Sequence, residues 1–422
     1  MPPRTILLIN KFYHDIGPAG GVGRYLLQEE QHLLEQGWNV VPFAMKDADA
    51  RPSQWDRFFV GGHDYSEPAW SPGAPAAALS LIWNREAARN LERLITATRP
   101  AVAHIHNIYH HLSPSILPVL ARHRIPVVQT LHDLRLLCPA IHMLRQGEIC
   151  ERCRGGRFIE AVRGRCVKGS LSASLLAAIE TRHQTSRRLY TRNVSRFLCP
   201  SSFLAGKYAE WGFPAERLTH LPNFVDVEAW RPDPAPENDG VLYFGRLSRE
   251  KGLHTLLRAQ ARIERGEAGA RTMPLRIAGG GPAEDELRSL AGELELEQVE
   301  FLGNLSSADL GRELARVKCT VLPSECYENG PLSLLESMAA GVPVVGADIG
   351  GIPEHIADGV DGLLFRPGDA ADLAAALLRA VDLGPAAGQA ARAKAENLYS
   401  LPVHMARLLA VLRDPSAEPC IS

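Results

Sequence analysis

Two glutamates, Glu328 and Glu336, stand eight positions apart on either side of a proline. Pro331 suits the start of a helix, because its ring fixes φ and its missing N–H is not needed there. Glu328 is therefore expected in a loop and Glu336 on the helix. The free N–H groups of such a helix start, with the helix dipole, favour a phosphate or a developing negative charge. The plainer alternative makes both carboxylates ordinary charges at a helix terminus.

Two cations, Arg246 and Lys251, follow a short apolar run at residues 241–244 and flank a glycine-containing turn. Arginine offers a planar fork to phosphate oxygens and lysine a mobile point charge, so the pair can neutralise a diphosphate without a metal. Residues 277–282 contain three consecutive glycines, which allow a ligand to approach the backbone closely. Taken alone, the first segment could be a solvated turn and the second a plain strand-to-helix turn.

The first half of the chain has a glycine-rich turn at residues 17–24, followed by an expected helix over residues 25–36. Such a turn suggests contact with a phosphate. Its spacing departs from G-x-G-x-x-G and from the P-loop, which disfavours a dinucleotide or ATP site. His132 and Asp133 directly follow the apolar run at residues 126–130, and this places them at the edge of a cleft. A structural histidine is the alternative.

Four further histidines crowd another strand end: His104, His106, His110 and His111. A His-x-His pair on one strand face could bind a metal. No carboxylate partner is evident nearby, so lining of the cleft or ordinary hydrogen bonding is favoured, with His106 on the acceptor side.

Four cysteines, Cys138, Cys150, Cys153 and Cys166, form C-x11-C-x2-C-x12-C in an insert that contains little apolar material. Four thiolates at such spacing can make a closed tetrahedral zinc site, although reduced thiols and disulfides stay open as alternatives.

Residues 151–200 hold 11 Lys or Arg against 3 Glu, a net charge of +8. That excess could attract an anionic acceptor or a lipid surface, or could simply be a solvated basic face.

Short β-rich runs alternate with helix-length amphipathic stretches, which predicts an α/β fold of two doubly wound units facing each other across a cleft. The predicted strands fall at residues 5–10, 39–43, 101–105, 126–130, 195–199, 218–221, 241–244, 275–278, 299–302, 319–322, 342–346 and 362–365. We assign residues 1–224 to a first domain with the cysteine insert 138–166, 225–240 to a linker, 241–387 to a second domain, and 388–422 to a helix returning to the first domain and a tail. Residues 71–80 are expected to form a flexible loop. In doubly wound folds the loops after the strands carry the ligand.

The composition, with 45% apolar and 22% charged residues, is typical of a globular protein, and the net charge of −2 gives no sign of a nucleic-acid partner. The first residues lack the apolar run of a signal peptide, and no later run is long enough to span a membrane. We therefore expect a cytoplasmic protein, with peripheral contact at the inner membrane face left open.

Together, the motifs of residues 240–365 resemble in order and placement the second domain of the retaining glycosyltransferases of family 4, whose fold is called GT-B. The resemblance implies a nucleotide-diphosphate sugar as donor, an acceptor that it does not identify, and no cofactor required for catalysis. It implies that Glu328 contacts the transferred sugar, Glu336 the ribose, and Arg246 and Lys251 the diphosphate. His132 would lie beside the sugar and Asp133 on the acceptor side. The remaining residues expected around the donor are Gly20, Gly21, Gly23, Gly245, Gly280, Gly281, Asn329, Gly330, Pro331 and Leu332.

Two other classes of function stay open. One is another GT-B activity, such as a sugar-nucleotide epimerase or a glycan phosphorylase, although no lysine for pyridoxal phosphate is evident. The other is a non-catalytic protein that binds a nucleotide sugar. Neither the nucleotide, the sugar, the acceptor nor the oligomeric state follows from the residues.

Overall fold

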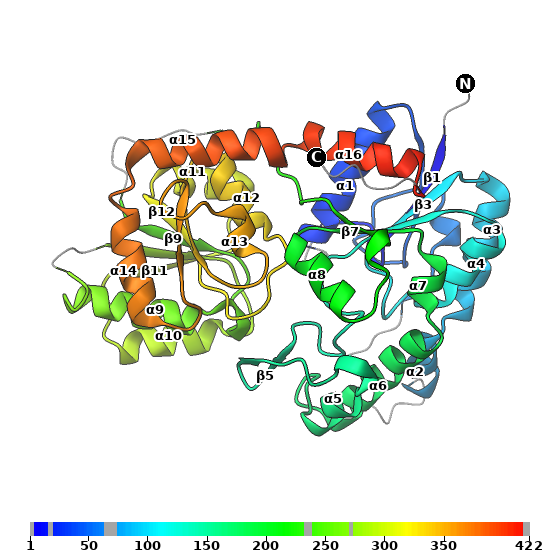
Figure 1. Cartoon of the computed structure of the whole chain (residues 1–422), viewed down its shortest axis with the longest axis horizontal. Helices are drawn as coiled ribbons and strands as arrows, with labels where there is room; N and C mark the ends of the chain where they lie inside the picture. Colours follow the sequence, from blue (N-terminus) through cyan, green and yellow to red (C-terminus); the bar gives the residue numbers. More distant parts are fainter. Residues whose placement is uncertain (1–3, 16–19, 63–73, 232–238, 270–272, 417–422) are drawn as a thin grey trace.

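The structure, a computed structural model, describes residues 4–15, 20–62, 74–231, 239–269 and 273–416. It contains two six-stranded parallel sheets, each covered by helices, and one two-stranded hairpin (Figure 1). The first sheet is built from β1 (Thr5–Ile9), β2 (Asn39–Phe43), β3 (Val102–Ile105), β4 (Val127–Thr130), β7 (Arg196–Cys199) and β8 (Leu218–His220). The second is built from β9 (Val241–Phe244), β10 (Leu275–Ala278), β11 (Val299–Gly303), β12 (Cys319–Leu322), β13 (Val344–Ala347) and β14 (Gly362–Phe365).

The helices follow the strands in the alternating order that a parallel sheet requires. Those of the first half are α1 (Gly20–Glu35), α2 (Ala74–Ile82), α3 (Arg85–Thr98), α4 (Leu117–Arg122), α5 (Ile159–Arg163), α6 (Leu171–Ser186), α7 (Leu189–Asn193) and α8 (Ser202–Glu210). Those of the second half are α9 (Leu253–Glu264), α10 (Glu284–Glu293), α11 (Ser307–Ala315), α12 (Leu332–Ala339), α13 (Ile352–His355), α14 (Ala370–Ala380), α15 (Gly384–Lys394), a π-helical turn η7 (Ala395–Tyr399) and α16 (Leu401–Arg413). Short 3-10 turns lie at η2 (Asp56–Phe58), η3 (Pro114–Ile116), η4 (Arg154–Gly156), η5 (Ala215–Arg217) and η6 (Arg249–Lys251).

The predicted fold class is confirmed: all twelve predicted strands are present, with bounds that differ by at most two residues. The strand order is β2-β1-β3-β4-β7-β8 in the first sheet and β11-β10-β9-β12-β13-β14 in the second. In each sheet, the chain first adds strands on one side of its first strand and then crosses to the other side. This reversal falls between β1 and β3 in the first sheet and between β9 and β12 in the second. Ligands of doubly wound sheets bind at such a reversal, beyond the carboxyl ends of the strands.

The two faces of the first sheet bury alternate residues of its strands. Leu7 and Ile9 of β1 pack in one apolar cluster with α3 and α4, whereas Ile6 and Leu8 pack in another with α1. Helix α16 contributes Met405, Leu408, Leu409 and Leu412 to this second cluster. The C-terminal helix therefore covers the first sheet beside α1, as Figure 1 shows.

The chain crosses between the two halves at two adjacent places. The backbone of Val225 donates to Tyr399 O at 2.8 Å and bridges to Ser400, so the outgoing and returning crossings lie side by side. Val225 and Trp230, which fall in the predicted linker, pack into the core of the second sheet. Residues 232–238 of that linker lie outside the described residues.

Two local expectations need correction, and one element was not expected. Residues 74–80 of the expected flexible loop belong to α2, because alanine and leucine favour helix even after a Pro/Gly-rich entry, and residues 71–73 lie outside the described residues. Helix α1 begins at Gly20, so the expected turn supplies its first residues. The insert contains a hairpin, β5 (Leu144–Arg145) and β6 (Glu148–Ile149), whose strands are too short to show a period in sequence. No described helix combines the length and apolar character needed to cross a membrane.

Candidate functional site

Glu328 and Lys251 form an ion pair beyond the carboxyl ends of the neighbouring strands β12 and β9. Lys251 Nζ donates to Glu328 Oε1 at 2.5 Å, and Ser324 Oγ donates to the same oxygen at 2.6 Å. Burial alone would raise the pKa of Glu328, but the Lys251 ammonium and these hydrogen bonds outweigh it and lower the pKa. Glu328 is therefore held ionised in a buried position.

Close backbone contacts fix the loop that carries Glu328. Gly351 N donates to Glu328 O at 2.7 Å. Gly350 has φ of +63°, and a Cβ there would stand 2.6 Å from Glu328 O and 2.7 Å from Glu328 N. Only glycine tolerates both the backbone angle and the approach. The paired glycines of residues 346–354, for which no role was expected, thus support the carboxylate.

Glu336 lies on α12 and meets a cation from the other half of the molecule. Arg24 Nη1, on α1, donates to Glu336 Oε1 at 2.6 Å. Burial raises the pKa of Glu336 to about 7, against the opposing effect of Arg24. The expected glycine turn therefore acts here through its last residue, Arg24, for which no role was expected.

Each of the two glutamates has one oxygen held and the other available. All hydrogen bonds to their side-chain carboxylates from described residues go to Oε1: Lys251 and Ser324 to Glu328, and Arg24 to Glu336. The other oxygen, Oε2, accepts no hydrogen bond from a described residue, and in neither glutamate is it a fully enclosed atom without a partner. A carboxylate fixed by a cation through one oxygen can accept a hydroxyl at the other without reorienting.

Arg246 and the glycine segments line the turn after β9. Arg246 is exposed, and its carbonyl accepts from Tyr243 Oη at 2.8 Å. A Cβ on Gly281 would stand 2.3 Å from Leu247 O, and one on Gly279 only 1.9 Å from Gly245 O. The two turns therefore need glycine to pack backbone on backbone. Gly279 was not among the glycines expected at the donor site, although it lies closer to a neighbouring backbone carbonyl than Gly281 does.

The start of α12 joins the two halves through backbone groups. Asn329 Nδ2 donates to His132 O at 2.9 Å, and Asn223 Nδ2 donates to Gly330 O at 2.7 Å. Pro331 is the residue that caps α12, one position before the helix. Leu332, its first residue, approaches Gly21 so closely that a Cβ on that glycine would stand 2.9 Å from Leu332 Cδ1. These residues are therefore where the second half contacts the first.

The other glycines of α1, Gly20 and Gly23, occupy its first turn. Gly20 has φ of +43° and a Cβ there would meet nothing within 4 Å, whereas Gly23 is buried. The preceding residues 16–19 lie outside the described residues. A phosphate-binding turn was expected here. The structure instead has the first turn of α1, and this helix start faces the start of α12.

His132 and Asp133 follow β4 as expected, but they have different surroundings. His132 is partly exposed, and burial together with His106 holds its pKa well below the usual value. Asp133 is engaged within the first half: its carboxylate accepts from Tyr109 Oη and from Arg135 N. The Asp133 carboxylate therefore orders its own loop.

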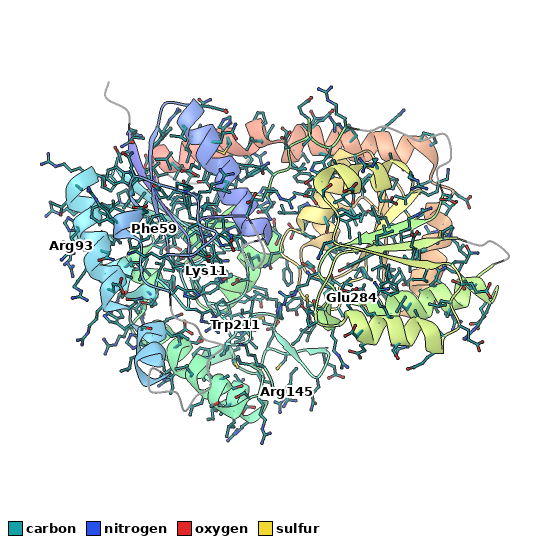
Figure 2. The ribbon with its side chains drawn as sticks, turned by 180° about the vertical axis from the view of Figure 1, so that it is seen from behind. Lys11, Phe59, Arg93, Arg145, Trp211 and Glu284 are labelled. Carbon is teal, nitrogen blue, oxygen red and sulfur yellow. The ribbon has the colours of Figure 1, made fainter. Side chains whose placement is uncertain are left out.

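Lys11, labelled in Figure 2, lies two residues after the end of β1 and was not expected from sequence. Its Nζ lies over the rings of Phe12 and Tyr109, at 5.3 and 5.0 Å from their centres. Burial lowers the pKa of Lys11, and Asp133 opposes this. A lone lysine after a strand gives no signal of this environment.

His106 was expected on the acceptor side, where its side chain would line the cleft. It is fully buried, behind His132, with the two rings stacked at 5.1 Å. His104 and His106 instead face the carboxylate of Glu29 from α1. No carboxylate was expected beside these histidines because Glu29 is 75 residues from His104. The available signal was its place on the buried face of α1, four residues after Tyr25.

The cysteine insert reaches toward the second half: in Figure 1, β5 lies below the level of the two sheets and points from the first half toward the second. Glu151 accepts from Lys207 Nζ at 2.8 Å and from Tyr327 Oη at 3.3 Å. Tyr327 directly precedes Glu328, and His142 is close enough to favour the charged form of that glutamate. The insert therefore borders the Glu328 loop.

The four insert cysteines are free thiols gathered in one region. Burial and then the nearby Cys138 raise the pKa of Cys153 to about 12, and burial with Cys150 raises that of Cys166. Among the described residues, the one set of three metal-type ligand atoms within 4.8 Å of each other is that of Glu29, His104 and His106. Sulfurs on one zinc would lie about 4 Å apart, given Zn–S bonds of about 2.3 Å. The donor types fit zinc, and the sulfurs would have to draw closer to bind it.

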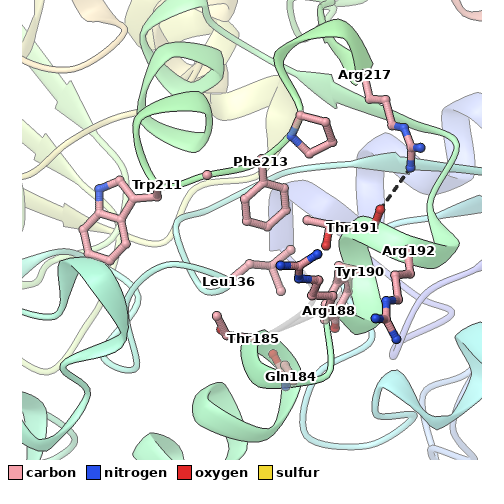
Figure 3. Close-up of a pocket in the computed structure, with 12 residues that line it drawn as sticks. Leu136, Gln184, Thr185, Arg188, Tyr190, Thr191, Arg192, Trp211, Phe213 and Arg217 are labelled. Carbon is pink, nitrogen blue, oxygen red and sulfur yellow. Dashed lines mark hydrogen bonds between the residues drawn. The ribbon is translucent and has the colours of Figure 1, made fainter.

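A cavity of about 500 Å³ lies in the first half and is lined by three arginines of the basic region and its surroundings, Arg188, Arg192 and Arg217. Figure 3 shows them around Phe213 and Leu136, with Arg217 bonded to the backbone of Thr191. None of the glutamates and cations described above lines this cavity.

The buried glutamates and their cations lie where the two units meet, and comparison with known proteins gives the class of protein. A family model described as glycosyltransferase family 4 matches residues 19–229, and one described as glycosyl transferases group 1 matches residues 226–397. The amylovoran biosynthesis glycosyltransferase AmsK of Erwinia amylovora is 31% identical over 406 residues, covering 92% of this chain and 95% of that protein. This chain belongs to glycosyltransferase family 4.

Other relatives match over shorter spans or in fold alone. Glycogen synthase of Mycobacterium tuberculosis is 33% identical over 240 residues, so the match spans 56% of this chain and about half, 55%, of that relative. Sucrose-phosphate synthase of Thermosynechococcus elongatus has a TM-score of 0.70 at 18% identity, covering 98% of this chain and 99% of that one. HepE of Anabaena, in complex with UDP and glucose, has a TM-score of 0.65 at 19% identity, covering 97% and 99%. These likenesses show the GT-B fold.

Proposed function

We propose that the protein transfers a sugar from a nucleoside-diphosphate sugar to a saccharide acceptor with retention of the anomeric configuration. The observation that carries the proposal is the pair of buried glutamates, each fixed by a cation through Oε1 and open at Oε2. Two hydroxyl-binding carboxylates beside a helix start and an exposed arginine suit a ligand that carries two sugars joined by a diphosphate. HepE, crystallised with UDP and glucose, supports a donor of this class.

Each residue then has a separate task. Arg246 and Lys251 neutralise the diphosphate, aided by the N–H groups at the start of α12 and the glycine turn after β10. Glu336 Oε2 binds the ribose hydroxyls, and Glu328 Oε2 binds hydroxyls of the transferred sugar. His132 lies beside that sugar from the first half. No metal takes part in this scheme.

Retention follows most simply from reaction on one face of the sugar. The bond from the anomeric carbon to the departing phosphate oxygen breaks, and the bond to the acceptor oxygen forms on the same face. The acceptor proton passes to the departing phosphate, which leaves as part of a nucleoside diphosphate. Glu328 is tied to Lys251 and serves as a hydroxyl acceptor in this route, not as a nucleophile.

For the acceptor, we propose a saccharide under assembly into a cell-envelope or extracellular polysaccharide. AmsK, matched along nearly its whole length, is by its name an enzyme of amylovoran biosynthesis. The insert bordering Glu328 and the arginine-lined cavity both belong to the first half, and their positive charge would attract an anionic or lipid-linked acceptor at a membrane face.

The test begins with a thermal-shift panel of nucleoside diphosphates and nucleotide sugars, because a ligand of the native state raises Tm. The nucleotide sugar that raises Tm is then incubated with saccharide acceptors, and the product's anomeric configuration is read by proton NMR. We expect the donor's configuration in the product. An inverted product would refute retention; epimerised sugar without an acceptor, or binding without turnover on any acceptor, would refute transfer.

A variant links this activity to the site. Glu328→Gln keeps the size of the side chain but loses the charge that pairs with Lys251, and should lower transfer while bare nucleoside diphosphate binds nearly as before. Glu325→Gln, in the same loop, is the matched control, because Glu325 bonds Thr255 instead. Unchanged turnover in Glu328→Gln would remove the glutamate from the reaction.

A further inference from the structure

Behind His132 lies a buried row of ionisable side chains that the proposed reaction does not use. Glu29 of α1 and His104 and His106, at the end of β3, are all fully buried. His104 Nδ1 lies 2.5 Å from Glu29 Oε1, and His106 Nε2 lies 3.2 Å from Glu29 Oε2. The other nitrogen of His106, Nδ1, lies 2.8 Å from His132 Nε2. The row therefore connects a wholly enclosed carboxylate to a histidine that is partly exposed.

The protons of this row can be placed from its contacts. A carboxylate only accepts hydrogen bonds, so His104 Nδ1, which bonds Glu29 Oε1, carries hydrogen. The 3.2 Å contact of His106 Nε2 with Glu29 Oε2 does not have hydrogen-bond geometry, but a nitrogen lone pair facing a carboxylate at that distance would be repelled, so hydrogen belongs on this nitrogen too. Burial would raise the pKa of Glu29, but His104 and His106 outweigh it and keep the pKa far below its usual value. Glu29 is thus ionised, which enforces the role of acceptor.

The consequence passes from His106 to His132. Burial lowers the pKa of both imidazoles, so each is neutral and carries one hydrogen. With its hydrogen on Nε2, His106 offers a lone pair at Nδ1, and the hydrogen in the 2.8 Å contact must come from His132 Nε2. His132 Nδ1 is then a lone pair, and no described residue occupies it.

The groups around the row leave this pattern undisturbed. His104 Nε2 lies 2.8 Å from Thr130 Oγ1. Tyr25 packs against the rings of His106 and His132, each at 5.5 Å, and its hydroxyl lies 2.7 Å from His404 Nε2. Since His404 Nδ1 bonds Pro222 O, its Nε2 accepts from the tyrosine. Glu30, the other nearby carboxylate of α1, is bonded to Tyr13 instead.

We propose that Glu29 and His106 are positioning residues that hold His132 in the tautomer with hydrogen on Nε2, leaving Nδ1 to accept a hydrogen bond from a hydroxyl of the donor sugar or acceptor. The inference rests on the proposed function for the presence of a sugar beside His132. The tautomer itself follows from the contacts together with the neutral state of His106 and His132. Fixing the tautomer of a histidine through its second nitrogen is how buried carboxylates act on catalytic imidazoles in other enzymes.

A metal ion is the competing explanation, because these three side chains bring ligand atoms within 4.8 Å of one another. The 2.5 Å contact between Glu29 and His104 is too short for two ligands of one ion, which stand about 3 Å apart when each bond is about 2.0–2.1 Å. Full burial also leaves no solvent-exposed position on such an ion. Hydrogen bonding therefore accounts for the distances better.

The direct test is nitrogen-15 NMR of the histidine rings in the full-length protein, with the His132 signals assigned by their loss in His132→Ala. We expect a protonated Nε2 and an unprotonated Nδ1 at neutral pH. Hydrogen on Nδ1 of His132 would overturn the proposal. So would a stoichiometric metal found by elemental analysis and lost in His104→Ala.

A pair of variants at one position tests the consequence for transfer. His106→Asn keeps an oxygen acceptor near the place of Nδ1, whereas His106→Leu removes it at similar bulk. We expect Asn to retain transfer within a few-fold of the parent and Leu to lose about tenfold or more, since one hydrogen bond corresponds to roughly a two- to tenfold effect and the freed ring adds to it. Nucleoside-diphosphate affinity, measured on both, should stay unchanged. Equal rates in the two variants would contradict the positioning role.

A double substitution separates this proposal from the proposed function. Adding His106→Leu to His132→Ala should cause no further loss, because the two residues act through one bond. If His132→Ala alone transfers at the parental rate, His132 has no place in the reaction, and the positioning role falls with it. If His132→Ala is impaired and His106→Leu impairs it again to the same degree, the proposed function survives and the coupling through His106 is refuted.

Discussion

Replacing Glu336 with glutamine should stabilise the unliganded protein at neutral and basic pH while weakening its hold on the nucleotide. In the folded protein, burial raises the pKa of this carboxyl from 4.5 to about 7 despite the bond from Arg24. A carboxyl whose pKa is higher in the folded state favours folding less as pH rises from the unfolded value through the folded one. A tenfold change in acidity corresponds to about 1.4 kcal/mol, so above pH 7 the buried charge costs about 3 kcal/mol.

Glutamine removes that charge and keeps an oxygen for Arg24. The gain in unfolding free energy should therefore approach about 3 kcal/mol at pH 8 and fall to about 1 kcal/mol or less at pH 5, where the parent carboxyl is already protonated. For a domain of this size, the difference corresponds to a Tm gain larger by several degrees at pH 8 than at pH 5. In contrast, affinity for nucleoside diphosphate should drop roughly ten- to hundredfold, because a hydrogen bond from a hydroxyl to a charged group is worth about 1.5–3 kcal/mol.

Differential scanning calorimetry at both pH values and isothermal titration with the nucleoside diphosphate measure the two effects. Glu300→Gln, at an exposed position on β11, is the control for loss of a carboxylate elsewhere in the second half. An equal change in Tm at pH 5 and pH 8 would refute the reasoning from burial. Unchanged affinity would remove Glu336 from the ribose site while leaving the stability argument intact.

Three other predictions concern the diphosphate and the insert. Arg246→Ala should weaken nucleoside-diphosphate binding roughly tenfold or more without loss of Tm, whereas Arg249→Ala in the neighbouring turn should not, because Arg249 is committed to Glu286; equal affinities by calorimetry would contradict this. Lys251→Ala should weaken the same binding and also raise the pKa of Glu328, which loses its cation. The raised pKa should appear as a loss of Tm that is larger at pH 8 than at pH 5, and an equal loss at both pH values would contradict it. The insert is predicted to hold one zinc ion through Cys138, Cys150, Cys153 and Cys166, and elemental analysis of metal-replete protein showing less than about a tenth of an equivalent would exclude it.

The fold was predictable because its strands are apolar β-rich runs between helix-length stretches, a pattern that local sequence records. Where local sequence is ambiguous, the expectations failed. The run at residues 74–82 has a proline and polar neighbours, yet its alanines and leucines make α2. The strands of the insert hairpin have two residues each, which is too short for an alternating pattern to be visible.

The site was predictable where its chemistry lies within a few residues of one strand end, as for Glu328 and Arg246. It was not predictable where two distant segments meet. Arg24 and Glu336 are 312 residues apart, and nothing in either segment names the other. Glu29 was missed for the same reason: a glutamate on an amphipathic helix usually faces solvent, and only the packing of α1 on β3 turns it inward.

These distant contacts also explain how the two halves share the site. Arg24 reaches Glu336 from α1, and Asn329 donates to the carbonyl of His132 from the Glu328 loop. Farther along, the carboxylate of Glu354 caps the start of α8 by accepting from the backbone of Ser202 and Phe203. All three contacts cross from one half to the other at residues next to the donor-type site. A relative movement of the halves would therefore change the hold on Glu336 and the place of His132 together; under the proposed function, this would tie occupancy of the nucleotide site to the geometry beside the transferred sugar.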